Sequence, residues 1–259
     1  MARGTYKTRA LCVRKTPLNE SDVIVTLVCC DGSQVSAVAK GARKPSNTFA
    51  SRLELYSLVD LLCVFGKNLD IVKEARLVAG HKNAREVLEL SAAGAVMAQI
   101  LCTGAQKNLE NTPLYNMSVR AFDELDAANI KTAPAVSAAH VLKTFAFCGV
   151  RPALNECCLC GANLQGALSV LASKGGFIKF SASEGGILCN SCNGYGAKSL
   201  PATTISNANA LLMAQFANIE SMKIAKSHVA SVLKLCQAWA RVHFNCKLSA
   251  VDFLLKCAI

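Results

Sequence analysis

Two Cys-x-x-Cys pairs, Cys157 with Cys160 and Cys189 with Cys192, constrain this chain more than any other feature of its sequence. Each pair can sit on a tight turn and offer two thiolates to one ion, so two pairs complete a closed tetrahedral site. Apolar runs at Phe177–Phe180 and 186–188 can form a hairpin between them. We therefore predict a zinc ribbon over residues 157–196 that holds one structural Zn²⁺.

The ligand set has one ambiguity, because Cys158 is a further thiol inside the first pair. We assign Cys157, which forms Cys-x-x-Cys-Gly with Cys160 and Gly161, and leave Cys158 as a buried or spare residue. Four thiolates leave no open coordination position, so the site should support folding and not catalysis. The alternative is four unligated core cysteines, and the gap between the pairs is longer than usual for such sites.

Most of the other cysteines stand singly in apolar sequence, as at Cys12, Cys63 and Cys102. In that context they are typical of small buried side chains in a reducing compartment. No apolar run reaches the ~18 residues of a membrane-spanning helix, and the N-terminus lacks the apolar core of a signal peptide. We expect a cytoplasmic protein with no membrane partner.

Residues 1–80 are predicted to form short strands separated by turn signals. The expected strands are Thr8–Arg14, Val23–Val28, Gln34–Ala39, 55–65 and 69–77, with a hairpin turn at Asp31-Gly32. Five strands in so short a segment fit a small barrel such as an OB-fold.

A basic loop, Lys40–Arg52, lies between the third and fourth expected strands. It combines cations with Gly, Pro and Ser, so it should be exposed and able to follow a phosphate backbone. An ordinary solvated loop is the alternative. The candidate DNA-binding residues of this segment are Arg9, Arg14, Lys40, Arg43, Lys44 and Arg52.

The net charge of +11 is unevenly distributed along the chain. Residues 1–80 carry twelve Lys/Arg against seven Asp/Glu, residues 81–156 carry seven against seven, and residues 157–259 carry nine against three. Two basic ends around a neutral middle suggest a polyanionic partner, of which nucleic acid is the commonest.

Helical periodicity begins after Gly80. We expect helices from about Ala84 to Gly104, after Asn111-Thr112-Pro113, and from Pro134 to Gly149, so residues 81–156 form the first part of a helical domain. His140 falls in the third helix, where a core or surface histidine is expected because no partner for catalysis is evident.

Residues 197–259 are expected to complete the helical domain. A helix from Met222 to Lys247 would have an apolar face anchored by Trp239. Its opposite face carries cations that are either merely solvated or a secondary surface for DNA or an acidic peptide. These cations are Lys223, Lys226, Lys234 and Arg241.

Several stretches, in order along the chain, resemble the family of bacterial recombination mediators called RecO. The resemblance lies in Leu18-Asn19-Glu20-Ser21-Asp22, in 36–43, and in 147–152 before the first cysteine pair. It continues in 180–192 and near the end, in 243–249 with Phe253-Leu254.

The resemblance implies an α+β, multidomain protein with an N-terminal OB-fold β-barrel, an α-helical domain and an inserted four-cysteine zinc ribbon. It also implies a non-enzymatic, nucleoid-associated DNA repair protein that binds single- and double-stranded DNA and anneals complementary strands. The implied partners are RecR and the acidic C-terminal tail of single-stranded DNA-binding protein, with a functional link to RecA. The basic loop and the four cysteines match the family by position, whereas the pocket for the acidic tail has no motif.

Two other classes of function compete with a DNA-binding mediator. OB barrels and zinc ribbons also serve RNA, so an RNA-binding or ribosome-associated protein is the runner-up. An enzyme is disfavoured because the sequence shows no clustered carboxylates for Mg²⁺, no P-loop and no dinucleotide fingerprint.

Overall fold

The computed structural model describes residues 4–44 and 47–258. Its internal contacts divide the chain into two compact units, residues 1–127 and 128–259. The finer division at residues 80, 156 and 196 stays a prediction.

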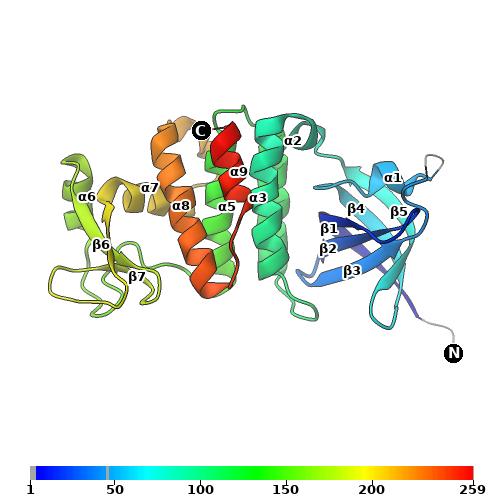
Figure 1. The fold of residues 1–259 in the computed structure, drawn as a ribbon, viewed down its shortest axis with the longest axis horizontal. Helices are drawn as coiled ribbons and strands as arrows, with labels where there is room; N and C mark the ends of the chain where they lie inside the picture. The colour runs from blue at the N-terminus through cyan, green and yellow to red at the C-terminus, as the bar shows by residue number, and fades with distance from the viewer. Residues whose placement is uncertain (1–3, 45–46, 259) are drawn as a thin grey trace. The chain divides into compact units, whose positions relative to one another are not determined.

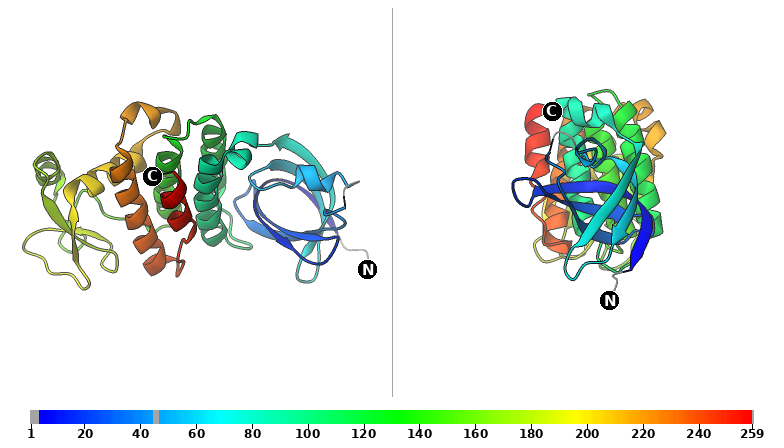
Figure 2. Two further views of the ribbon diagram at one scale, coloured as in Figure 1. Left: turned by 45° about the horizontal axis from the view of Figure 1, so that its top comes forward. Right: turned by 90° about the vertical axis from the view of Figure 1, so that its right-hand side faces the viewer.

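A closed five-stranded barrel opens the first unit (Figures 1 and 2). The strands are β1 (Thr5–Pro17), β2 (Val23–Cys29), β3 (Gln34–Ala39), β4 (Leu58–Val64) and β5 (Asp70–Ala79). Their order around the barrel is β1-β2-β3-β5-β4, with β3 and β5 parallel and the other pairs antiparallel. The predicted small five-stranded barrel is confirmed.

The alternation seen in the sequence closes the barrel because it places one set of side chains inside. Val25, Leu27, Ala37, Val59 and Leu61 all belong to this buried cluster. The predicted hairpin turn is present at Asp31-Gly32, where Gly32 has φ +88° and lies against the backbone of Asn111, leaving no room for a Cβ. The observed strands match the expected ones to within three residues at each end. Strand β1 is longer at both ends because its pairing continues into polar residues, whereas β4 begins only at Leu58, after Tyr56 with its positive φ.

Four helices complete the described part of the first unit: α1 (Phe49–Arg52), α2 (Lys82–Glu86), α3 (Leu88–Gly104) and α4 (Thr112–Ala127). The single helix expected from Ala84 is broken at Val87, whose backbone is extended. Tyr56, with φ +68°, packs against Gly94 of α3 and stacks on Phe122 of α4 at 5.2 Å between ring centroids. These contacts fix the helices on the barrel within this unit.

The second unit combines helices with a small three-stranded sheet. Its helices are α5 (Ala133–Phe147), α6 (Gln165–Ser173), α7 (Ala202–Met213), α8 (Lys226–His243) and α9 (Ala250–Cys257), with short 3-10 turns at Phe216–Asn218 and Glu220–Met222. The sheet has the order β7-β6-β8, from β6 (Phe177–Ser181), β7 (Gly186–Leu188) and β8 (Lys198–Pro201). Of these elements, α6, α7, α9 and β8 were not predicted from the sequence.

Trp239 on α8 joins the sheet to the helices, as its expected role of anchor requires. It is 1% exposed, and its indole N–H donates to the carbonyl of Val150 at 2.9 Å. Its ring lies 5.9 Å from that of Phe180 on β6 and 6.4 Å from that of Phe145 on α5, between centroids. The apolar face of α8 therefore packs on both the sheet and α5.

His140 is fully buried on α5. Burial lowers its pKa to about 3, so the imidazole is neutral in the folded protein. This agrees with a core histidine. Within the described part of the chain, no helix combines the length and apolarity needed to cross a membrane.

Candidate metal centre and nucleic-acid interface

The ribbon brings Cys157, Cys160, Cys189 and Cys192 together, with all four sulfur atoms within 4.8 Å of one another. The sulfur atoms of Cys160 and Cys189, one from each pair, lie 3.8 Å apart. A tetrahedral ion with Zn–S bonds of about 2.3 Å separates its sulfur ligands by about 3.8 Å. The spacing of the thiols therefore fits a zinc ion.

Backbone hydrogen bonds position the first cysteine pair. The amide of Gly161, which has φ +71°, donates to the carbonyl of Cys157 at 2.8 Å and closes the turn. The amide of Cys158 donates to the carbonyl of Ile187 at 2.9 Å, which ties the turn to β7. The same strand leads directly into Cys189, so this bond brings the two pairs together.

A lysine that was not predicted as a site residue, Lys179, holds the second pair. Lys179 lies on β6, and its Nζ donates to the carbonyls of Asn190 and Cys192 at 3.3 and 3.4 Å. It also donates to the side-chain oxygen of Asn193 at 3.2 Å. In the sequence, the only indication of this role is that Lys179 is a polar residue within the apolar run Phe177–Phe180.

The protonation of the cluster also suits a cation. Burial opposes ionisation of Cys157, but hydrogen bonds from backbone amides, led by that of Cys189, lower its pKa to about 6. Hydrogen bonds with the Cys189 and Cys160 sulfurs instead raise the pKa of Cys192 to about 12. Four thiolates this close repel one another, and a divalent metal removes that conflict. Cys158 is outside the cluster, and burial raises the pKa of its thiol.

The described part of the basic loop is anchored to the β1–β2 connection. Asp22 accepts the Gly41 amide at 2.7 Å, and this bond is the main reason that the pKa of Asp22 is lowered. The Arg43 amide donates to the carbonyl of Ser21 at 2.9 Å, and its guanidinium donates to the carbonyl of Asn19 at 2.8 Å. Residues 45 and 46 of the predicted loop lie outside the described residues.

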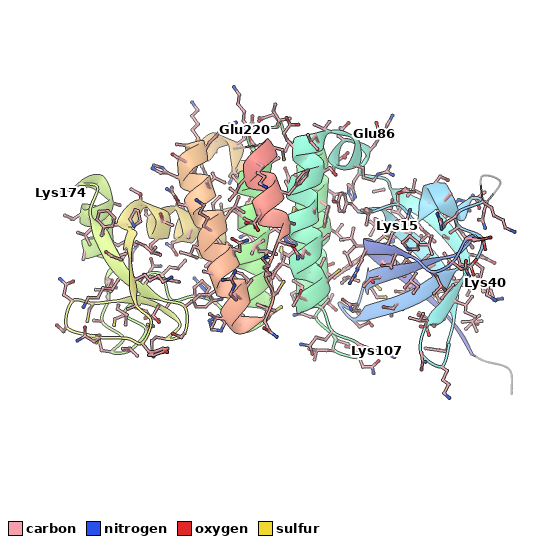
Figure 3. The ribbon with its side chains drawn as sticks, in the orientation of Figure 1. Lys15, Lys40, Glu86, Lys107, Lys174 and Glu220 are labelled. Carbon is pink, nitrogen blue, oxygen red and sulfur yellow. The ribbon has the colours of Figure 1, made fainter. Side chains whose placement is uncertain are left out.

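The anchoring divides the predicted loop cations into two groups. Lys40 and Lys44 are exposed, and Figure 3 shows the side chain of Lys40 at the surface of the barrel. Arg43 is also exposed, but part of its guanidinium holds the loop. Arg52 donates to the carbonyl of Ala75 on β5 at 2.8 Å, so it fixes α1 to the barrel.

The other two candidates of the barrel, Arg9 and Arg14, are exposed on β1. Arg9 and Arg52 line the same surface cavity, whereas the residues lining that cavity do not include Arg14. The six predicted cations therefore do not form a single cluster.

The cationic face expected on the C-terminal helix needs a correction. The helix begins at Lys226, and Lys223 lies before it with φ +47°, so Lys223 does not share a helical face with the others. Periodicity extended the prediction too far because Lys223 and Ala225 fall at helical spacing from residues of α8, although neither belongs to the helix. Lys226 donates to the carbonyl of Ala258 at 3.0 Å.

Lys234 and Arg241 instead line a cavity of about 450 Å³ between α8 and the sheet. Lys198 on β8 is the third cation, and none of the described residues lining the cavity is Asp or Glu. Much of the remaining lining is apolar and includes Phe180, Leu200, Leu235 and Val242. The second unit therefore has an apolar groove whose described lining carries cations and no acids.

Comparisons with known proteins agree with this architecture. The family model described as "Recombination protein O N terminal" matches residues 1–81, and "Recombination protein O C terminal" matches residues 85–249. A protein named DNA repair protein RecO from Caldanaerobacter subterraneus is 24% identical over 252 residues, which cover 96% of this chain and 97% of the relative. One of the same name from Nocardioides is 29% identical over 238 residues, covering 88% and 93%.

Proposed function

Since the chain belongs to the recombination protein O family, we propose that it is a non-enzymatic, DNA-binding recombination mediator in DNA repair. The observation that carries this proposal is the cationic loop, held by Asp22, on a five-stranded barrel. It presents Lys40 and Lys44 to solvent, where they can contact phosphates.

The proposed mechanism is electrostatic. Lys and Arg displace condensed counterions from phosphates, which supplies binding energy without sequence reading. Two strands held on one basic protein repel each other less, so complementary strands can pair. In the cell, this activity would act with RecR to help RecA replace single-stranded DNA-binding protein on DNA.

The ribbon would support the fold in this mechanism. A bound Zn²⁺ would crosslink the turns of Cys157–Cys160 and Cys189–Cys192 and would have no free coordination position. Cysteine variants should therefore lose stability before they lose DNA contacts. Cysteine-to-alanine variants that fold normally but no longer bind DNA would contradict this role.

The groove between α8 and the sheet is our candidate for the acidic tail of single-stranded DNA-binding protein. Its cations suit carboxylates, and its apolar lining suits hydrophobic side chains of the same peptide. Lys234→Glu with Arg241→Glu should abolish binding of a tail peptide, while Lys223→Glu with Lys256→Glu serves as a charge-matched control. Equal peptide affinity in both variants would remove this assignment.

Annealing of complementary strands coated with the cognate single-stranded DNA-binding protein tests the proposed function. The wild-type chain should accelerate annealing, and its affinity for single-stranded DNA should fall steeply with salt. Lys40→Gln with Lys44→Gln should lower the slope of log affinity against log salt by about 1.4, at about 0.7 for each lost phosphate contact. Lys82→Gln with Lys107→Gln, also exposed in this unit, is the matched control.

The RNA-binding alternative is tested in the same experiment. A strong preference for single-stranded RNA over DNA of equal length, together with no acceleration of annealing, would replace the mediator with an RNA-binding protein.

A further inference from the structure

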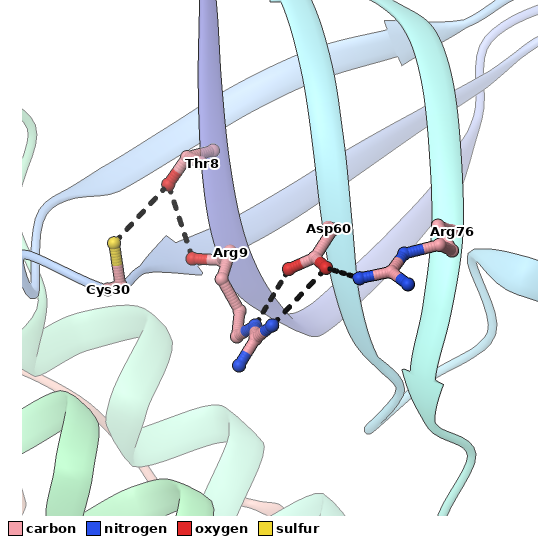
Figure 4. A network of polar contacts seen from close by, with 5 residues as sticks. All are labelled: Thr8, Arg9, Cys30, Asp60 and Arg76. Carbon is pink, nitrogen blue, oxygen red and sulfur yellow. Dashed lines mark hydrogen bonds and ion pairs between the residues drawn. The ribbon is translucent and has the colours of Figure 1, made fainter.

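Three charged residues form a row across adjacent strands of the barrel. Arg9 on β1 is directly opposite Asp60 on β4, and Asp60 is directly opposite Arg76 on β5. Asp60 binds Arg9 through Nε and Nη2 at 2.7 and 3.2 Å and Arg76 through Nη2 at 2.6 Å (Figure 4). One carboxylate thus holds two guanidinium groups on the outer face of the barrel.

The row keeps a net positive charge. Hydrogen bonds from Arg9 and Arg76 lower the pKa of Asp60 to about 2, so its carboxylate stays ionised near neutral pH. The Arg76 side chain is 79% exposed and that of Arg9 47%. Their bonds to Asp60 fix the direction of both guanidinium groups and still leave N–H groups that can bind a second anion in a forked geometry.

A β-bulge adds another cation to the same face. On β5, Glu74 is opposite Leu62 and Val72 is opposite Cys63, so Lys73 is the extra residue between them. Regular alternation would turn Lys73 toward the opposite side of the sheet from Glu74 and Arg76. The bulge instead leaves it exposed on the outside, as bulges often redirect a side chain.

These residues line one open groove of about 1130 Å³. The cations of its described lining are Lys7, Arg9, Arg52, Lys73 and Arg76, and the acids are Asp60 and Glu74. A second cavity of about 610 Å³ shares Arg9 and Asp60 and reaches Arg120 on α4. The two cavities together are larger than a small ligand requires, and their lining extends across three strands to a helix.

We propose that this groove is a second polynucleotide site that binds the phosphate backbone of a single nucleic-acid strand, so that one barrel can bind two nucleic-acid strands at once. The inference rests on the proposed DNA-binding function. Lys40 and Lys44 lie in the first part of the basic loop, which is anchored before β2, whereas the groove is lined by β1, β4 and β5 and by the end of the same loop, at Asn47–Phe49 and Arg52. Asn47 lines the groove and donates to the carbonyl of Lys40 at 3.0 Å, so the two sites meet there.

This juxtaposition gives annealing a physical route. A DNA strand bound to the loop and a DNA strand bound in the groove would lie side by side. Each would have its phosphates neutralised and its bases free to pair. The ligand is identified by the pattern of oriented guanidinium groups and lysines, which suits a row of phosphates and reads no base.

Binding of short thymidine oligonucleotides of about eight nucleotides, within the range that one OB barrel covers, tests the inference. The full-length chain and its variants would be titrated by native mass spectrometry and assayed for annealing. Lys73→Gln with Arg76→Gln should bind one oligonucleotide fewer than wild type and lose most annealing. The loop variant, Lys40→Gln with Lys44→Gln, should also bind one fewer, and the Lys82→Gln, Lys107→Gln control should match wild type.

Lys73→Gln alone leaves the Asp60 bridge intact and should lower the salt slope by about 0.7. If the groove variants match the control in stoichiometry, salt slope and annealing, the second site is refuted while the proposed function stands. If the wild-type chain itself neither binds nor anneals DNA, the proposed function fails first.

Discussion

Replacing Trp239 by Phe should destabilise the second unit by several kcal/mol. Trp239 is the only tryptophan of the chain and is almost completely buried between Phe145 on α5 and Phe180 on β6. Phenylalanine keeps an aromatic ring at this position but removes the N–H that donates to the carbonyl of Val150. The substitution therefore tests the link between the ribbon sheet and the helices.

Two effects set the magnitude. Removing the donor of this part-buried hydrogen bond costs about 1–3 kcal/mol. The smaller ring loses the packing of a few heavy atoms, worth roughly 1–2 kcal/mol at about 0.8 kcal/mol per buried CH₂. Together they predict a loss of about 2–5 kcal/mol, a large part of the roughly 5–15 kcal/mol that stabilises a typical domain.

Urea unfolding followed by far-UV circular dichroism measures this loss. With a typical m-value of about 2 kcal/mol per molar urea, the midpoint of Trp239→Phe should fall by about 1–2.5 M. Tyr195→Ala removes an aromatic ring that is 84% exposed and should stay within about 0.5 kcal/mol of wild type. If Trp239→Phe and Tyr195→Ala shift the midpoint equally, the described packing of α8 against the sheet is wrong.

Three further predictions concern the metal site, the buried His140 and the basic loop. Cys157→Ser should reduce zinc content below one ion per chain, measured by elemental analysis, whereas Cys158→Ser should keep it; equal loss in both would reverse the ligand assignment. Because the pKa of His140 is lowered to about 3, the unfolded state alone gains a proton as pH falls below about 6.5, so stability should fall by about 1.4 kcal/mol per pH unit between about pH 6 and pH 4. His140→Gln should remove this component, and an unchanged pH profile would argue against a buried neutral imidazole. Asp22→Ala should speed hydrogen exchange at Gly41 roughly tenfold by removing its acceptor, with exchange in β4 as the control; no change at Gly41 would show that the bond does not hold the loop.

The barrel and the cysteine centre could be predicted because both depend on local patterns. Alternation of apolar and polar residues and the Asp31-Gly32 turn define β2 and β3 within a short segment. The pairing register then follows, because only one register keeps the apolar side chains of both strands on the buried face. The two Cys-x-x-Cys pairs carry their geometry in their spacing. Gly161, which needs a positive φ to close the first turn, follows directly after Cys160.

Other parts depended on contacts that no local pattern records. Helix α6 and strand β8 lie in Gly-, Ser- and Ala-rich sequence, where neither the helical nor the strand periodicity of apolar residues is distinct. The β8 strand forms by pairing with β6, residues Phe177–Phe180 matching Lys198–Pro201, and that pairing joins segments far apart in the chain. Short, weakly patterned elements of this kind follow tertiary contacts more than propensity.

The role of each cation was the least predictable property, since it is decided by cross-strand partners and not by sequence neighbours. Arg43 and Arg52 stand in a basic loop, which predicts phosphate contacts, yet both donate to backbone carbonyls and hold the loop and α1 in place. Arg76 stands in a strand with no motif, yet the register of β4 and β5 puts it beside Asp60 and Arg9. A net charge of +11 therefore indicates that a polyanion is a suitable partner. Only the register of the paired strands indicates where the polyanion can bind. In this barrel the register favours the face formed by β1, β4 and β5 as well as the loop.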